Sequence, residues 1–126
     1  MSQRGSATLL TVALLSTLVM VAAGMAGVSR LVVAHVQATV AADAAALAAA
    51  PLTFLGGHPA REAATHAAVN GATLVSCRCS ADPRPVIRTV TVEVVSHIEL
   101  PVFGRIPVRA RAAAEFDPLR LLGGEG

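Results

Sequence analysis

Residues 34–50 read AHVQATVAADAAALAAA, a stretch whose one formally charged side chain is Asp43. Alanine has the highest helix propensity of all residues, so this stretch predicts a helix. We expect the helix to end before Pro51, because a residue that precedes proline is disfavoured in the α region. One set of alanines recurs at every fourth position and follows one side of this helix: Ala34, Ala38, Ala42, Ala46 and Ala50. Small side chains let two helices approach closely, so we interpret this row as a packing surface for other helices.

The stretch continues an apolar segment that begins near the N-terminus. No charged side chain occurs between Arg4 and Arg30. About 20 apolar residues in a helix cross a hydrocarbon core of about 30 Å. Residues 7–29 therefore predict a transmembrane helix, and residues 30–50 predict its helical extension outside the membrane. Two further pairs of small residues have packing spacing within the span: Ala22 with Ala26, and Ala23 with Gly27.

The segment before the span, residues 1–6, is short and leader-like. Few positive charges flank the span, but this brief front end favours an N-terminus in the cytoplasm and a C-terminal part outside the cell membrane. The alternative is a secretory signal that is cleaved among the small residues 22–27. The apolar run is longer than the centre of such a signal, which has about 7 to 15 residues, so a retained single-pass anchor is favoured.

The rest of the chain predicts a small exported α+β module over residues 51–116. A short helix is expected over residues 59–69, where a proline suits the first turn and an Asn-Gly pair follows the last. The apolar residues then alternate with a period of two, which predicts a strand at 72–77 and an antiparallel hairpin that turns at 100–104. Residues 117–126 are expected to form a flexible tail.

The composition argues for a membrane protein and against a nucleic-acid partner. Apolar residues make up 54% of the 126 residues and charged residues 14%, whereas about 25% charged is usual. The net charge is +2, but the ten basic residues are scattered arginines, and no aromatic residue is placed among them to stack on bases. We therefore expect no binding of nucleic acid.

The two cysteines, Cys77 and Cys79, are the first candidates for chemistry. A disulfide across one residue closes a very small loop and stabilises little. Unpaired thiols and a metal site are the alternatives, although His58, His66 and His97 lack the spacing of metal ligands. We expect no metal, and the choice between a disulfide and free thiols stays open.

No catalytic motif is present. A His/Asp pair would have to come from His35 and Asp43, which lie eight residues apart on one helix without a nucleophile beside them. We interpret both as polar residues on a solvated face. The chain also lacks a nucleophile elbow, a phosphate-binding glycine loop and a zinc-protease motif. The sequence thus predicts no enzymatic activity, no cofactor and no small-molecule substrate.

Two motifs carry a likeness to a known family. The residues Arg4-Gly5-Ser6-Ala7 before an apolar span resemble the start of TadE/TadG-like proteins of the tight-adherence (Flp) pilus machinery. The sequence QATVAADAAALA, residues 37–48, resembles the Q-x-x-A-D-A-A-A-L-A segment that follows the span in that group, with two extra residues before the aspartate. The resemblance covers residues 4–50, and the remainder is similar in style only.

The resemblance implies a membrane-anchored minor pseudopilin or assembly component that packs with other pilus-assembly or secretion proteins through its long helix. Some members of the family are trimmed by a prepilin peptidase after a glycine, and the equivalent cleavage here falls after Gly5 and leaves Ser6 first. Processed members carry a glutamate five residues into the mature chain, where this chain has Leu10. The actinobacterial TadE-like branch is similar to this chain in lacking that acid.

Two other functions stay open. One is a small secreted binding domain, released by signal peptidase, in which the arginine-lined face of residues 105–116 meets an anionic partner. The other is an enzyme that uses the cysteine and histidine side chains.

Overall fold

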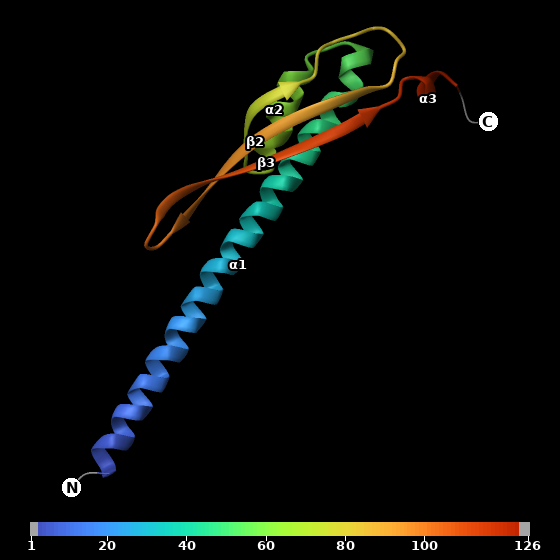
Figure 1. Cartoon of the computed structure of the whole chain (residues 1–126). Helices are drawn as coiled ribbons and strands as arrows, with labels where there is room; N and C mark the ends of the chain where they lie inside the picture. Colours follow the sequence, from blue (N-terminus) through green and yellow to red (C-terminus); the bar gives the residue numbers. More distant parts are fainter. Residues whose placement is uncertain (1–2, 124–126) are drawn as a thin grey trace. The chain divides into compact units, whose positions relative to one another are not determined.

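The computed structural model describes residues 3–123, which form the predicted α+β fold (Figure 1). The elements in chain order are α1 (Gln3–Leu55), α2 (Pro59–Val69), β1 (Thr73–Arg78), β2 (Arg88–Leu100), β3 (Gly104–Phe116) and α3 (Leu119–Leu122). The chain divides into two compact units, one up to Val32 and one from Val33 onward, and α1 contributes residues to both.

The first unit consists of the N-terminal part of α1. This helix is long and apolar enough to cross a membrane, and its leucine, valine and methionine side chains in this unit are exposed. Five hydroxyl side chains here, for example Thr11 and Ser16, each donate a hydrogen bond to the carbonyl oxygen four residues earlier at 2.8–2.9 Å. Because lipid offers no partner to polar groups, this internal bonding suits a helix that is surrounded by hydrocarbon.

The second unit contains an antiparallel sheet with the strand order β1-β2-β3. Strands β2 and β3 form the predicted hairpin, and its pairs run from Arg88 with Phe116 to Leu100 with Gly104. The chain reverses over residues 101–103, and Gly104 follows with φ 72°, a left-handed conformation that glycine adopts without steric cost. Strand β2 begins at Arg88, and Val86 lies exposed in the preceding loop.

The core of the second unit is made almost entirely of alanine and valine. The predicted alternation is confirmed on both hairpin strands, since their buried side chains are two residues apart. Valines at 90, 92 and 94 of β2 and alanines at 110, 112 and 114 of β3 pack in one cluster with alanines of α1 and α2. Ala63 and Ala67 supply the contribution of α2. The helices therefore cover the apolar side of the hairpin.

The predicted helix end before Pro51 is wrong, because α1 continues to Leu55. A proline inside a helix removes one backbone hydrogen bond, and here one further turn follows it. That turn is held by burial and by a local hydrogen bond. Thr53 is 2% exposed, and its hydroxyl donates to the carbonyl oxygen of Ala50 at 2.7 Å. The helix ends where Gly56 enters the left-handed region with φ 87°.

The C-terminal segment that was expected to be a flexible tail contains α3, a helix of four residues. The backbone N–H of Leu119 donates to the carboxylate of Asp117 at 3.0 Å, a local contact two residues apart that is typical of an Asx turn. Residues 124–126 of the expected tail and residues 1–2 of the leader-like segment lie outside the described residues.

Candidate helix-packing site

One face of α1 in the second unit is buried in the core of the protein itself. The alanines that the sequence suggested for packing against other helices, Ala34, Ala38, Ala42, Ala46 and Ala50, are all at most 4% exposed. Ala41, Ala45 and Ala49 on the same side of the helix are fully buried. Four of the five row members belong to the cluster that contains the sheet valines. The small alanine side chains therefore let α1 pack closely against the sheet and α2 of the same chain.

The opposite face of α1 is the one open to other molecules. We call the residues Val33, Val36, Val40, Asp43 and Leu47 the outer face. Its four apolar side chains are between 51% and 66% exposed, and Asp43 is exposed as well. The spacing of three or four residues places all five on one side of the helix. Sequence reasoning missed this face because it followed alanines, although the spacing of the larger apolar residues could have revealed it.

The same spacing continues upstream in the sequence of the first unit. Steps of three and four residues lead back from Val33 through Ser29 to Ala26, Ala22, Val19, Leu15 and Val12. Of the pairs of small residues predicted in the span, Ala22 and Ala26 therefore belong to this row, while Ala23 and Gly27 do not. Gly27 is half-buried and the other three are exposed. An apolar repeat of this kind is typical of helices that pack along a shared seam.

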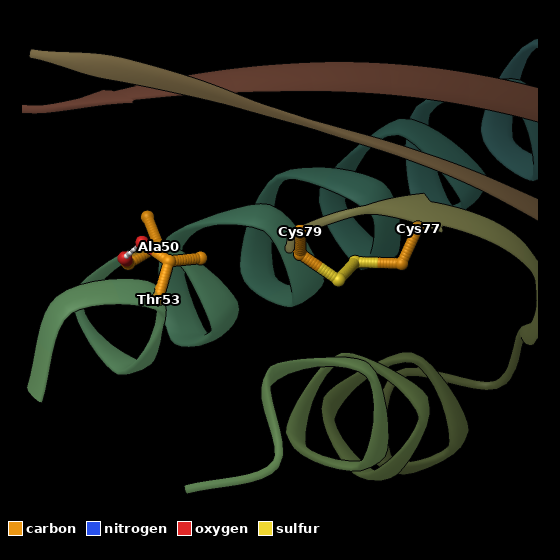
Figure 2. Close-up of a disulfide and its surroundings, with 4 residues drawn as sticks. All are labelled: Ala50, Thr53, Cys77 and Cys79. Carbon is orange, nitrogen blue, oxygen red and sulfur yellow. Dashed lines mark hydrogen bonds between the residues drawn. A yellow bond between two sulfur atoms is a disulfide. The ribbon is translucent and has the colours of Figure 1, made fainter. Parts of the chain in front are cut away.

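The structure joins Cys77 and Cys79 by a disulfide at the end of β1, with the Cα atoms 5.4 Å apart (Figure 2). Cys79 is 8% exposed and belongs to the core cluster, near the last turns of α1, and Cys77 packs against that cluster. Within residues 3–123, no group of three or more His, Cys, Asp or Glu side chains could hold a metal ion. The disulfide thus acts as part of the core in this structure.

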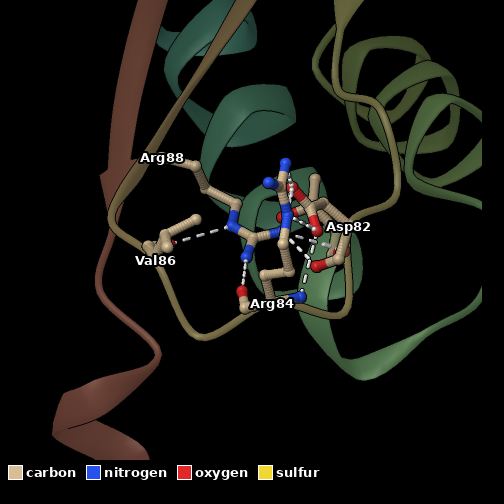
Figure 3. A network of polar contacts seen from close by, with 5 residues as sticks. Asp82, Arg84, Val86 and Arg88 are labelled. Carbon is tan, nitrogen blue, oxygen red and sulfur yellow. Dashed lines mark hydrogen bonds and ion pairs between the residues drawn. The ribbon is translucent and has the colours of Figure 1, made fainter.

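A polar network fixes the loop before β2 to the end of α1 (Figure 3). Nη1 of Arg88 donates to the carbonyl oxygen of Thr53 at 3.2 Å and also to the carbonyl oxygen of Asp82. Nη2 of Arg88 donates to the carbonyl oxygen of Arg84. Arg84 in turn donates to both carboxylate oxygens of Asp82 at 2.8–3.2 Å. The hydrogen bonds from the Arg84 side chain and backbone lower the pKa of Asp82 from its ordinary value of 3.8 to about 2. These arginines hold the loop and are not an open anion site.

The arginine-lined side of β3 is partly neutralised by a strand neighbour. Arg111 and Arg109 donate to the two carboxylate oxygens of Glu93 at 2.6 and 3.1 Å. These hydrogen bonds, the one from Arg111 first, lower the pKa of Glu93. Two of the arginines that would meet an anionic partner are therefore already paired, which weakens the case for a secreted anion-binding domain.

Comparison with known proteins finds a family match for most of α1. Residues 5–51 match the model of a family described as putative Flp pilus-assembly TadE/G-like. This segment is TadE/G-like. The match confirms the likeness inferred from the start of the chain and from residues 37–48. No curated protein and no solved structure matches the chain.

The TadE/G-like segment contains both the apolar span and the part of α1 that packs on the sheet. A single long apolar helix near the N-terminus, in a segment that matches a family of pilus assembly, fits a single-pass membrane anchor. Strands β1 to β3 lie beyond the matched residues.

Proposed function

We propose that this protein is a non-enzymatic, membrane-anchored TadE-like minor pseudopilin or assembly component of a Flp-type pilus or secretion system. The observation that carries the proposal is the overlap of residues 5–51, which match the TadE/G-like family, with an apolar helix long enough to cross a membrane. The proposed segments are a leader-like segment 1–6, a span 7–29, a helical extension that begins at residue 30 and continues past Pro51 to Leu55, an exported module up to residue 116, and a C-terminal segment that contains α3.

The long helix has two separate tasks in this proposal. Its span anchors the chain with the N-terminus in the cytoplasm, and its outer face packs against helices of other assembly proteins. The alanine face cannot serve such partners while the second unit is folded, since it is at most 4% exposed. Helix contacts between chains then depend on Val33, Val36, Val40 and Leu47 outside the membrane, and on Ala22 and Ala26 within the span.

A role without chemistry is supported by the family and by the composition of the described surface. The description of the matched family names pilus assembly and does not name a reaction. The histidines and acids of residues 3–123 form no cluster suited to a metal, and the two sulfur atoms are joined to each other. We propose that the protein uses no cofactor, nucleic acid or small-molecule substrate.

Membrane extraction and protease protection test the anchor and its orientation. The chain should stay in the membrane fraction after alkaline carbonate treatment, and external protease should degrade the exported module in spheroplasts. The protein should also co-purify from mild detergent with components of the pilus machinery. Release by carbonate, or failure to co-purify with any such component, would rule out the proposed role.

N-terminal sequencing of the protein from its native membrane decides how the leader-like segment is used. A mature chain that begins at Ser6 supports prepilin-peptidase cleavage after Gly5. An intact Met1 indicates an anchor that is not cleaved. This outcome is compatible with Leu10, which stands where processed members carry a glutamate. A start within residues 24–28 would instead indicate a secretory signal and contradict a retained anchor.

A further inference from the structure

We propose that the outer face of α1 binds the helix of a different chain, and that this partner helix carries an arginine or lysine opposite Asp43. The inference rests on the proposed function in one respect, which is that all anchored helices cross the membrane in the same direction. It goes further by specifying the chemistry of the partner.

The outer face has the pattern of a coiled-coil seam. Val33, Val36, Val40, Asp43 and Leu47 follow one another at steps of three, four, three and four residues. Helices with apolar residues at such steps pack side by side in a left-handed supercoil. All four apolar members are more than half exposed, and so a considerable apolar area is open to a partner. The seam occupies the side of α1 opposite the alanines that pack on the sheet.

Asp43 is the one charged member of this seam. Among residues 3–123 its carboxylate forms no ion pair, and the row around it is apolar on both sides. When another helix packs onto Val40 and Leu47, the carboxylate between them loses water. An ionised carboxylate that is removed from water is strongly destabilising unless a cation is placed against it. An arginine or lysine on the partner helix compensates this loss most strongly, because an ion pair with hydrogen bonds is stronger than a contact with a neutral donor.

A second copy of this chain does not supply that charge. Two anchored copies are parallel, and in register they place Asp43 against Asp43, where like charges repel. Arg30 is the one arginine of α1 after Arg4, and it precedes Asp43 by 13 residues. A copy would have to shift by about 20 Å along the helix to bring the two together. A polar residue in a seam is known to select the partner, and here it selects against self-pairing.

Mixing experiments with the full-length chain test this charge rule without knowledge of the natural partner. Wild type and Asp43→Arg chains, labelled at the C-terminus with donor and acceptor dyes, are reconstituted in phosphatidylcholine vesicles. Energy transfer then reports parallel pairing. We expect the wild type and Asp43→Arg mixture to associate about tenfold more tightly than either chain alone, or more. We also expect Asp43→Val to self-associate more tightly than the wild type.

Glu99→Arg provides the matched control, because Glu99 is an exposed acid on β2 away from the outer face. Its mixture with the wild type should transfer energy no better than the wild type alone. If the mixture of wild type and Glu99→Arg gained as much energy transfer as the mixture with Asp43→Arg, the attraction would be unspecific and the proposal would be overturned. It would also be overturned if the wild type self-associates as tightly as the Asp43→Arg mixture, or if Asp43→Val gains nothing. Carbonate retention of each variant is measured alongside, so that loss of the anchor, which would contradict the proposed function, is distinguished from failure of the charge rule.

Discussion

Arg88 Nη1 lies 3.2 Å from the carbonyl oxygen of Thr53, so the first residue of β2 binds the last turn of α1. The same carbonyl accepts the backbone N–H of Asp82 at 2.7 Å. The last carbonyl groups of a helix have no partner within the helix, and here one is satisfied by a loop and a strand that come about 30 residues later in the chain. The helix end thus depends on the folded module.

Replacement of Arg88 by methionine should destabilise the second unit by about 1–3 kcal/mol, because the partly buried contacts to the carbonyl groups of Thr53 and Asp82 lose their charged donor. Methionine keeps much of the length of the side chain and so limits the packing change. The free energy of unfolding can be measured by urea titration in mild detergent, followed by circular dichroism. Arg105→Met is the control. Arg105 is exposed near the hairpin turn, so this substitution should change the free energy of unfolding little. Equal losses for both variants would contradict the role of Arg88.

Enlargement of the alanine face should destabilise the fold. Ala45 is 0% exposed and packs in the core cluster, so Ala45→Leu has no space for its additional carbon atoms. Overpacking of a core costs about 1–3 kcal/mol. The same substitution at Ala64, which is exposed on α2, should change the free energy of unfolding little. If Ala45→Leu were as stable as the wild type, the alanine face would not be packed as described.

Acid should weaken the loop network in a defined range of pH. The pKa of Asp82 is lowered to about 2, so its ionised form is favoured in the folded state. The stabilisation is complete above the ordinary pKa of 3.8 and is lost as the pH falls toward 2. The melting temperature should therefore drop over this range. Asp82→Asn should reduce the slope, and the remainder should come largely from Glu93, whose pKa is also lowered. An unchanged slope in Asp82→Asn would exclude this contribution.

Alkylation and mass spectrometry should detect the disulfide. Protein denatured without a reductant should take up no label at Cys77 or Cys79, and two labels should appear after reduction. The cross-link encloses a single residue, so its loss in Cys77→Ser should cost about 2 kcal/mol or less. Uptake of two labels without reduction, in protein taken from its native membrane, would show that the thiols are free.

The helix and the hairpin could be predicted from the sequence because each has a local pattern. Each pattern is formed by residues that are close in the sequence: the apolar span, the alanines after it, and the alternation around Val90 and Val108. The partner of the alanine row could not be predicted in this way. Spacing shows which side chains share a face, but the sheet that covers Ala42 is formed by residues about 50 positions later.

The continuation of α1 past Pro51 has a similar explanation. The local preference for a helix end is overcome by the burial of Thr53 and by the hydrogen bond from Arg88, both of which depend on tertiary structure. The candidate site was found only in part for the same reason. The spacing of Ala22 and Ala26 in the span is visible in the sequence, whereas the exposure of Val36 and Val40 follows from the burial of the opposite face.

The alanine core also affects how the protein responds to temperature. Each buried alanine removes a single methyl group from water, so the second unit exposes little apolar area per residue when it unfolds. The heat capacity change of unfolding depends on that area. A small heat capacity change gives a flat curve of stability against temperature, in which cold and heat both weaken the fold gradually. A subunit built in this way would keep a similar, modest stability over a broad range of growth temperatures.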